Sequence, residues 1–169
     1  MESMNHHIQE YTIQLRKGHI QKAYKGIMTF MADLKSDLEH HRPDWVGSSL
    51  YFGTMDMTYF AFTPPALKNK KLKVAIVFLH ESCSFEVWLA GNNRRIQAEY
   101  IDLLKDRNIG EYKLSQVQPG VDSIVVSVVA EQPDFDHPEE LKKLIEDSTI
   151  NFADDILTMF EYLQIRPKP

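Results

Sequence analysis

Cysteine is almost missing from this sequence, and several other features are absent altogether. The chain of 169 residues has one cysteine, Cys83, so it cannot form an internal disulfide. It has no run of about 18 apolar residues, which disfavours a membrane-spanning segment. Its first residues lack the basic segment followed by an apolar one that marks a secretory signal. Together these absences predict a protein of the reducing cytoplasm.

The sequence also lacks the motifs of common enzymes and cofactor sites. It contains no glycine-rich phosphate loop, no dinucleotide fingerprint, no CxxC pair and no GxSxG hydrolase elbow. Four of the seven histidines occur as adjacent pairs, His6 with His7 and His40 with His41, and adjacent side chains rarely converge on one ion. The sequence therefore predicts neither a cofactor nor a metal site.

Positive charge is in the minority. The 19 lysines and arginines face 24 aspartates and glutamates, which gives a net charge of -5. Nucleic-acid recognition rests largely on cationic side chains that meet phosphates. The overall charge therefore disfavours nucleic acid as a partner, although a local basic patch keeps it as an alternative.

What is present is a nearly continuous series of helical and strand patterns. With 43% hydrophobic residues, the chain suffices for one well-buried core, so residues 1–169 are predicted to form a single domain. Apolar residues at helical spacing predict two N-terminal helices, at about His7–Arg16 and His19–His40. A long last helix is expected to have Asp136 as its N-cap and Pro138 in its first turn.

Residues that favour strands predict the rest of the fold. Two strands are expected near Leu50–Gly53 and Met57–Thr63, and the alternative is a single strand bulged at Gly53. A short strand is expected near Glu111–Gln116 and an inner strand at Ser123–Glu131. Because the connections between successive strands are short, we expect antiparallel pairing. The predicted fold is α+β, with packed helices on a mainly antiparallel sheet of about five to six strands.

The stretch from Leu72 to Gln97 predicts a hairpin that runs into a helix, and the rest of the fold is organised around it. Its first strand is apolar on both faces, which is typical of a central strand covered on both sides. A tight turn would pair His80 with Phe85. That register places His80 and Glu86 on opposite faces, which disfavours acid/base cooperation between them.

Three segments follow the helix QLRKGHIQKAYKGIM: MDMTYFAFTP (Met55–Pro64), LKVAIVFLHE (Leu72–Glu81) and FEVWLAGNNRRIQ (Phe85–Gln97). Together with that helix they resemble a family of uncharacterised bacterial cytoplasmic proteins. The likeness spans most of the chain and implies a bacterial cytoplasmic protein. It brings no established activity and no catalytic residue to this sequence.

A basic cluster is expected at the open end of the hairpin. Lys71 and Lys73 should meet Asn93, Arg94 and Arg95 at the start of the next helix. Arginines in the first turn oppose the helix dipole, at a cost of about 0.3 to 1 kcal/mol each. A bound anion would offset this cost, and a helix N-terminus is itself suited to anions.

Glu86 and Trp88 complete the predicted ligand-binding set, because they share one face of the second hairpin strand with Lys73 further along it. A solvated charged surface, or internal pairing of the cations with Glu86 or Asp56, is the alternative and the more usual meaning of a charge run. Strand aromatics such as Tyr59 and Trp88 are likewise more often core than pocket lining.

The leading hypothesis is a non-enzymatic cytoplasmic binding or interaction domain for a small anionic ligand. One alternative is an enzyme that acts on an anionic small molecule through Glu86 with Arg94 or Arg95. The other is a nucleic-acid-associated protein that uses the lysine-rich entry to the hairpin. The sequence predicts no membrane partner and leaves the oligomeric state open.

Overall fold

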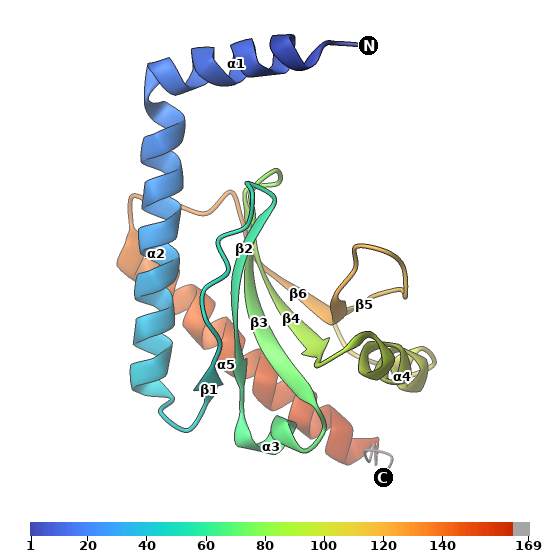
Figure 1. The fold of residues 1–169 in the computed structure, drawn as a ribbon. Coiled ribbons are helices and arrows are strands. Elements are labelled where there is room, and N and C mark those ends of the chain that lie inside the picture. The colour runs from blue at the N-terminus through green and yellow to red at the C-terminus, as the bar shows by residue number, and fades with distance from the viewer. Residues whose placement is uncertain (164–169) are drawn as a thin grey trace.

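The computed structural model describes residues 1–163 (Figure 1). Within them the chain forms five helices and six strands. The elements are α1 (Met4–Lys17), α2 (His19–His41), β1 (Val46–Gly47), β2 (Met57–Thr63), α3 (Pro65–Lys68), β3 (Leu72–Leu79), β4 (Ser84–Gly91), α4 (Arg94–Leu104), β5 (Lys113–Leu114), β6 (Ser123–Glu131) and α5 (Pro138–Tyr162). This is the predicted α+β arrangement, with two N-terminal helices and a long C-terminal helix.

The six strands form one antiparallel sheet in the order β1-β2-β3-β4-β6-β5. The prediction of antiparallel pairing from short connections is confirmed. β3 is central, as its apolar sequence indicates. β6 returns to pair with β4, so the short β5 is left at the edge.

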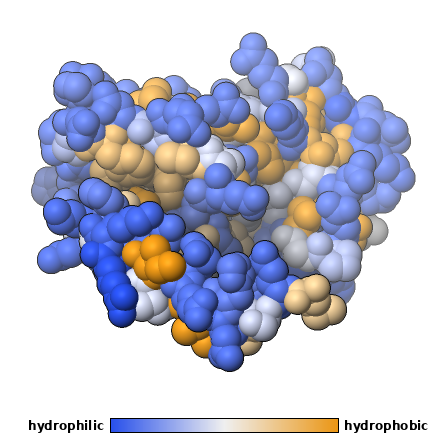
Figure 2. Space-filling model, turned by 90° about the horizontal axis from the view of Figure 1, so that it is seen from above, coloured by the Kyte–Doolittle hydropathy of each residue, from blue (hydrophilic) through white to orange (hydrophobic). Residues whose placement is uncertain are grey.

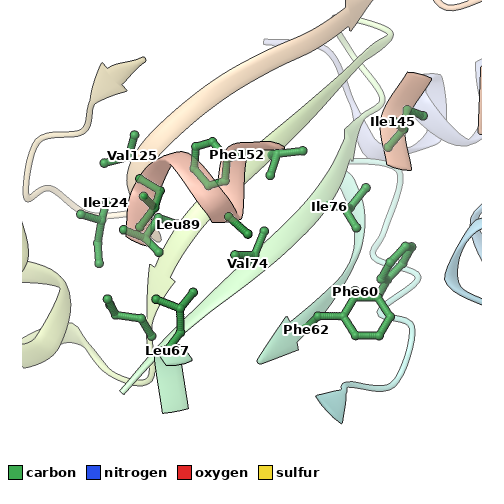
Figure 3. Close-up of a cluster of buried hydrophobic side chains, with 14 of the residues drawn as sticks. Phe60, Phe62, Leu67, Val74, Ile76, Leu89, Ile124, Val125, Ile145 and Phe152 are labelled. Carbon is green, nitrogen blue, oxygen red and sulfur yellow. The ribbon is translucent and has the colours of Figure 1, made fainter. Parts of the chain in front are cut away.

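The main core lies between one face of the sheet and the helices α2 and α5, which run across it (Figure 1). Ile145 and Phe152 of α5 lie against the sheet (Figure 3). Their neighbours in this core include Val74, Ile76 and Leu89, which are fully buried. The alternation of side chains along each strand gives this face its apolar residues and leaves the others for the opposite face.

No helix among residues 1–163 runs along the opposite face of the sheet (Figure 1), but β3 is buried on both of its faces, as expected. α4 lies at one end of the sheet, where its buried side chains join the main core and its first turn borders this face (Figure 1). Ala75 and Val77 are nevertheless buried there, because larger side chains such as Tyr59 and Trp88 pack against them. Small side chains need little cover, and we call this surface the open face.

The central hairpin pairs two residues away from the predicted register. Leu79 pairs with Ser84 and Phe78 with Phe85, so the turn spans residues 80–83. The turn ends at Cys83 in a left-handed conformation with φ of 48°. Because the offset is two residues, each side chain keeps its face. The prediction that His80 and Glu86 lie on opposite faces is therefore confirmed.

The segment before β2 differs from both predicted alternatives. Strand pairing with β2 occurs at Val46–Gly47, and Tyr51 makes only an isolated bridge with Tyr59. The chain turns near Gly53, whose φ is 73° and where a Cβ atom would lie 2.0 Å from the Met57 carbonyl oxygen. A strand over Leu50–Gly53 is therefore excluded by this turn.

Three smaller features also differ from the predictions: one helix, the length of one strand and one N-cap. α3 was not predicted, and β5 is shorter than the expected strand at Glu111–Gln116. The N-cap of α5 is His137 rather than Asp136, with Pro138 in the first turn as predicted. Asp134 explains the shift, because its side chain accepts the Asp136 backbone N–H and lies 2.7 Å from His137 Nδ1.

Candidate ligand-binding site

A hollow of about 280 Å³ lies on the open face, next to the N-terminus of α4. It is lined by residues from β2, β3, β4, the β4–α4 junction and the entry to β6. They are Met57, Tyr59, Ala61, Lys73, Ala75, Val77, Trp88, Ala90, Gly91, Asn92, Asn93, Arg94, Gln97 and Asp122.

The floor of the hollow consists of small side chains on three neighbouring strands. Ala61 of β2 pairs with Ala75 of β3, and Ala90 of β4 pairs with Lys73. Because these alanines end at Cβ, the sheet surface is low where they lie. Trp88, the β4 partner of Ala75, rises beside them.

Tyr59 forms an aromatic wall of the hollow. Its ring centroid lies 4.9 Å from that of Tyr51, which bridges to it across the strand edge. Burial raises the pKa of Tyr59, and Tyr51 and the negative charge of Asp122 raise it further. The phenol therefore stays protonated and can donate a hydrogen bond.

The N-terminus of α4 is fixed closely against the end of β4. Asn93 is the N-cap, and its Oδ1 accepts the backbone N–H of Ile96 at 2.9 Å. A Cβ atom on Gly91 would lie 2.9 Å from the Gln97 backbone nitrogen and 3.0 Å from Ile96 Cγ2. A glycine is needed here because any side chain would push α4 away from the hollow.

Arg94 and Lys73 bring two positive charges to the hollow, but only Arg94 has a carboxylate partner. Arg94 Nη2 lies 2.9 Å from Asp122 Oδ1, and its Nη1 donates to the Val121 carbonyl oxygen and, at 3.2 Å, to Gln97 Oε1. The cost of an arginine at a helix N-terminus is therefore offset by Asp122 rather than by Glu86 or Asp56. Lys73 makes no ion pair within residues 1–163.

The structure brings four of the seven predicted site residues to the hollow. Lys73, Trp88, Asn93 and Arg94 line it. Lys71, Glu86 and Arg95 are not among its lining residues, so the predicted convergence is only partly realised.

The remaining three predicted residues are engaged elsewhere. Glu86 Oε2 accepts a hydrogen bond from Trp88 Nε1 at 2.6 Å. Arg95 is exposed and lies 3.9 Å from Glu99, one turn along α4. Lys71 contributes its backbone, since its carbonyl oxygen accepts the Asn92 N–H at 3.0 Å. Lys71 and Arg95 are thus cations close to the hollow in sequence but outside it.

Sequence reasoning missed Gln97 and Asp122. Gln97 is 2% exposed, and its Nε2 donates to the carbonyl oxygens of Val121 and Ser123 at 2.8 and 3.0 Å. A glutamine on the inner side of a predicted helix was a usable signal, because a buried polar side chain requires partners. No local sequence pattern indicated that Asp122 belongs to the site, since its partner Arg94 is distant in sequence.

Two further observations bear on the chemistry of the site. Within residues 1–163, no group of three or more His, Cys, Asp or Glu side chains could hold a metal ion. No helix in the same range is long and apolar enough to span a membrane.

Comparison with known protein families assigns the chain to one of them. Residues 4–160 match the family described as "Domain of unknown function (DUF7000)". The chain belongs to this family. No curated protein and no solved structure matches the chain.

Proposed function

We propose, for this member of a family of unknown function, that the chain binds a small planar organic anion in the hollow on the open face. The observation that carries the proposal is the position of Lys73 in the hollow without a carboxylate partner among residues 1–163. A lysine in that position favours an anionic ligand, because a ligand carboxylate or phosphate provides the missing charge partner.

The size of the hollow supports a small ligand. Its volume of about 280 Å³ lies just below the range of roughly 300 to 1,000 Å³ typical of small-molecule sites. A single ring with one acidic substituent suits this space, whereas a dinucleotide does not.

The lining supports a ligand with one apolar part and one polar end. Tyr59 and Trp88 offer aromatic surface above the alanine floor, and planar groups pack well on such surfaces. Lys73, Asn92 and the N-terminus of α4 lie in the same hollow and suit the anionic group. The ring would pack at the aromatic wall while the anion lies near Lys73.

The alternative functions have less support. An enzyme that uses Glu86 with Arg94 or Arg95 needs these groups in one site, whereas Glu86 bonds to Trp88 and Arg95 lies one helical turn from its partner Glu99. A nucleic-acid-associated protein needs several cations along a phosphate path, and only two cationic side chains line the hollow.

The proposal includes a cellular location, the cytoplasm, and a bacterial origin. The scarcity of cysteine supports a cytoplasmic protein. The resemblance of the Met55–Pro64 and Phe85–Gln97 segments to uncharacterised bacterial proteins supports a bacterial origin.

A thermal-shift screen tests ligand binding. The purified chain is screened against aromatic carboxylates, nucleotides, phosphosugars, organic acids and divalent metals, and hits are measured by calorimetry. A ligand that binds only the folded state raises the melting temperature by mass action. We expect a small aromatic acid among the hits, with Lys73→Ala weakening its binding about ten-fold, or about 1.4 kcal/mol.

The structure provides matched controls for this experiment. Lys71→Ala is the control for Lys73→Ala, because it removes a neighbouring cation that lies outside the hollow. Arg95→Ala is in the same way the control for Arg94→Ala. We expect Lys71→Ala and Arg95→Ala to leave affinity within two-fold. The proposal fails if no anion stabilises the protein, or if Lys71→Ala weakens binding as much as Lys73→Ala.

A further inference from the structure

α1 is a helix with an apolar side that its own chain does not cover. None of its residues is buried in the part of the chain that the structure describes. Figure 1 shows it turning aside from the end of α2, crosswise to α2 and separated from the sheet. Met4, Ile8 and Tyr11 lie on one side at helical spacing and are 71%, 52% and 60% exposed. An isolated helix of 14 residues is only marginally stable in water.

An apolar groove runs along α2 on the same molecule. It has a volume of about 880 Å³ and lies between α2, the tip of the β3–β4 hairpin and the start of α5. Ile27, Phe30, Phe78 and Phe135 line it, together with Cys83. Seen from above, hydrophobic residues form separate patches among hydrophilic ones (Figure 2).

The helix α1, which we call the arm, matches the groove along α2 in length. The groove follows α2 from Lys22 to Asp33, which is roughly 16 Å at 1.5 Å per residue. The apolar side of α1 runs from Met4 to Leu15 over the same number of residues. Gly26 lies along the groove, and a Cβ atom there would meet nothing within 4 Å, so a second helix has room to approach.

The arm cannot fill the groove of its own chain. α1 ends at Lys17 and α2 begins at His19, so Gly18 alone connects them. Antiparallel helix pairs need a loop of about two to five residues to reverse direction. Gly18, with φ of 78°, instead sends α1 away from α2.

We propose that α1 docks into the α2 groove of a second copy of this chain, and that two copies exchange arms in a symmetric dimer. In a two-fold dimer each copy contributes one arm and one groove. The three exposed arm residues cover on the order of 300 Å². With a similar area from the groove, each copy approaches the roughly 800 Å² of a standard interface. This inference is independent of the proposed ligand site, which lies on the other face of the sheet.

Cross-linking tests the contact, because Cys83 is the only native cysteine and lies in the groove. Ile8→Cys places a second thiol on the docking side of α1, and Ile13→Cys places one on the opposite side. With a short bis-maleimide, we expect a covalent dimer from Ile8→Cys and little from Ile13→Cys. Adding Cys83→Ser to Ile8→Cys should remove the product.

Light scattering tests the assembly without cross-linking. We expect the wild-type chain to run at about twice its monomer mass of 19.6 kDa. Tyr11→Glu on the arm and Gly26→Leu in the groove should each weaken dimerisation at least ten-fold, whereas Ile13→Glu should not. Neither Tyr11 nor Gly26 is part of the core, and far-UV circular dichroism checks that each variant is folded.

Three results would overturn the inference. The first is a wild-type chain that stays monomeric at high micromolar concentration. The second is a dimer whose cross-link from Ile8→Cys persists after Cys83→Ser. The third is a dimer that Tyr11→Glu and Gly26→Leu leave intact, which would place the contact on another surface, such as the open face.

Discussion

His80 shows how much of a residue's behaviour depends on partners from other segments. Its Nε2 lies 2.8 Å from Thr58 Oγ1, and that hydroxyl donates its single proton to the Phe52 carbonyl oxygen. His80 Nε2 must therefore donate to Thr58, which fixes the tautomer. The ring also packs against Phe78 and Tyr24. Burial lowers the pKa of His80, and the charge of Asp56 opposes this only in part.

The lowered pKa of His80 predicts a loss of stability on acidification. The unfolded chain protonates His80 near its ordinary pKa of 6.5, before the folded chain does. The unfolded state therefore binds more protons as pH falls below about 6.5, and the free energy of unfolding decreases until pH passes the folded pKa. Urea unfolding between about pH 7.5 and pH 5 measures this.

His80→Gln is the variant for this measurement, because a second histidine with a shifted pKa also contributes to the pH dependence of stability. This is His137, whose pKa is raised by its hydrogen bond to Asp134, and it remains in both proteins. We expect the decrease on acidification to be smaller in His80→Gln than in wild type. Identical slopes in the two proteins would contradict the assignment.

α4 is the element that joins the fold to the candidate site. Its N-cap and the close contact at Gly91 fix its first turn beside the hollow. Gln97 connects it to the strand entry at Val121 and Ser123. The helix start is therefore positioned by close packing on the end of β4 and by hydrogen bonds to the entry of β6.

Removing the N-cap of α4 should destabilise the protein. Asn93→Ala leaves the Ile96 N–H without its side-chain acceptor, which costs about 1 kcal/mol. Asn92→Ala is the matched control, because the neighbouring Asn92 does not cap the helix, and we expect a change within about 0.5 kcal/mol. Urea unfolding of both variants measures the difference, and equal effects would contradict the capping role.

At the scale of the whole molecule, α5 connects parts of the sheet that are distant in sequence. Its apolar side packs along the face that β2, β3, β4 and β6 share (Figures 1 and 3). Phe152 is 1% exposed, and its ring lies 5.0 Å from that of Tyr112 near the sheet edge. The core is therefore continuous, and we expect the sheet to unfold in one transition together with α2, α4 and α5, which contribute to that core.

Phe152→Ala should destabilise the whole molecule by creating a cavity in this core. Loss of a buried phenylalanine costs about 3 to 5 kcal/mol. Leu144→Ala on the same helix is the control, because Leu144 is 48% exposed, and we expect less than about 1 kcal/mol. Chemical denaturation followed by fluorescence and circular dichroism measures both, and separate transitions for the two signals would contradict a single cooperative unit.

The longer elements of this fold could be predicted from the sequence because their causes are local. The apolar spacing of α2 and α5 and the alternation in β2, β3 and β4 all lie within short segments. The antiparallel sheet followed from short connections. Even the faces of His80 and Glu86 were correct, since a two-residue error in register preserves the alternation of side chains.

The candidate site could be predicted only in part, because charge partners come from distant segments. Lys73 and Arg94 converge as expected, since Lys73 lies at the start of β3 and Arg94 begins α4 just after the paired strand β4 ends. Asp122, which partners Arg94, reaches the site because β6 inserts beside β4, and no local pattern encodes that order. The same applies to Glu86, whose carboxylate is bound to Trp88 rather than to an arginine.

The sequence by itself determined the longer helices and strands and which of their side chains turn inward, because backbone preferences and side-chain periodicity act over a few residues. Only the tertiary structure decided that one face of the sheet stays open, that three alanines of different strands form a hollow there, and that α1 projects without cover. These features depend on how elements pack against one another, and packing joins residues that the sequence separates.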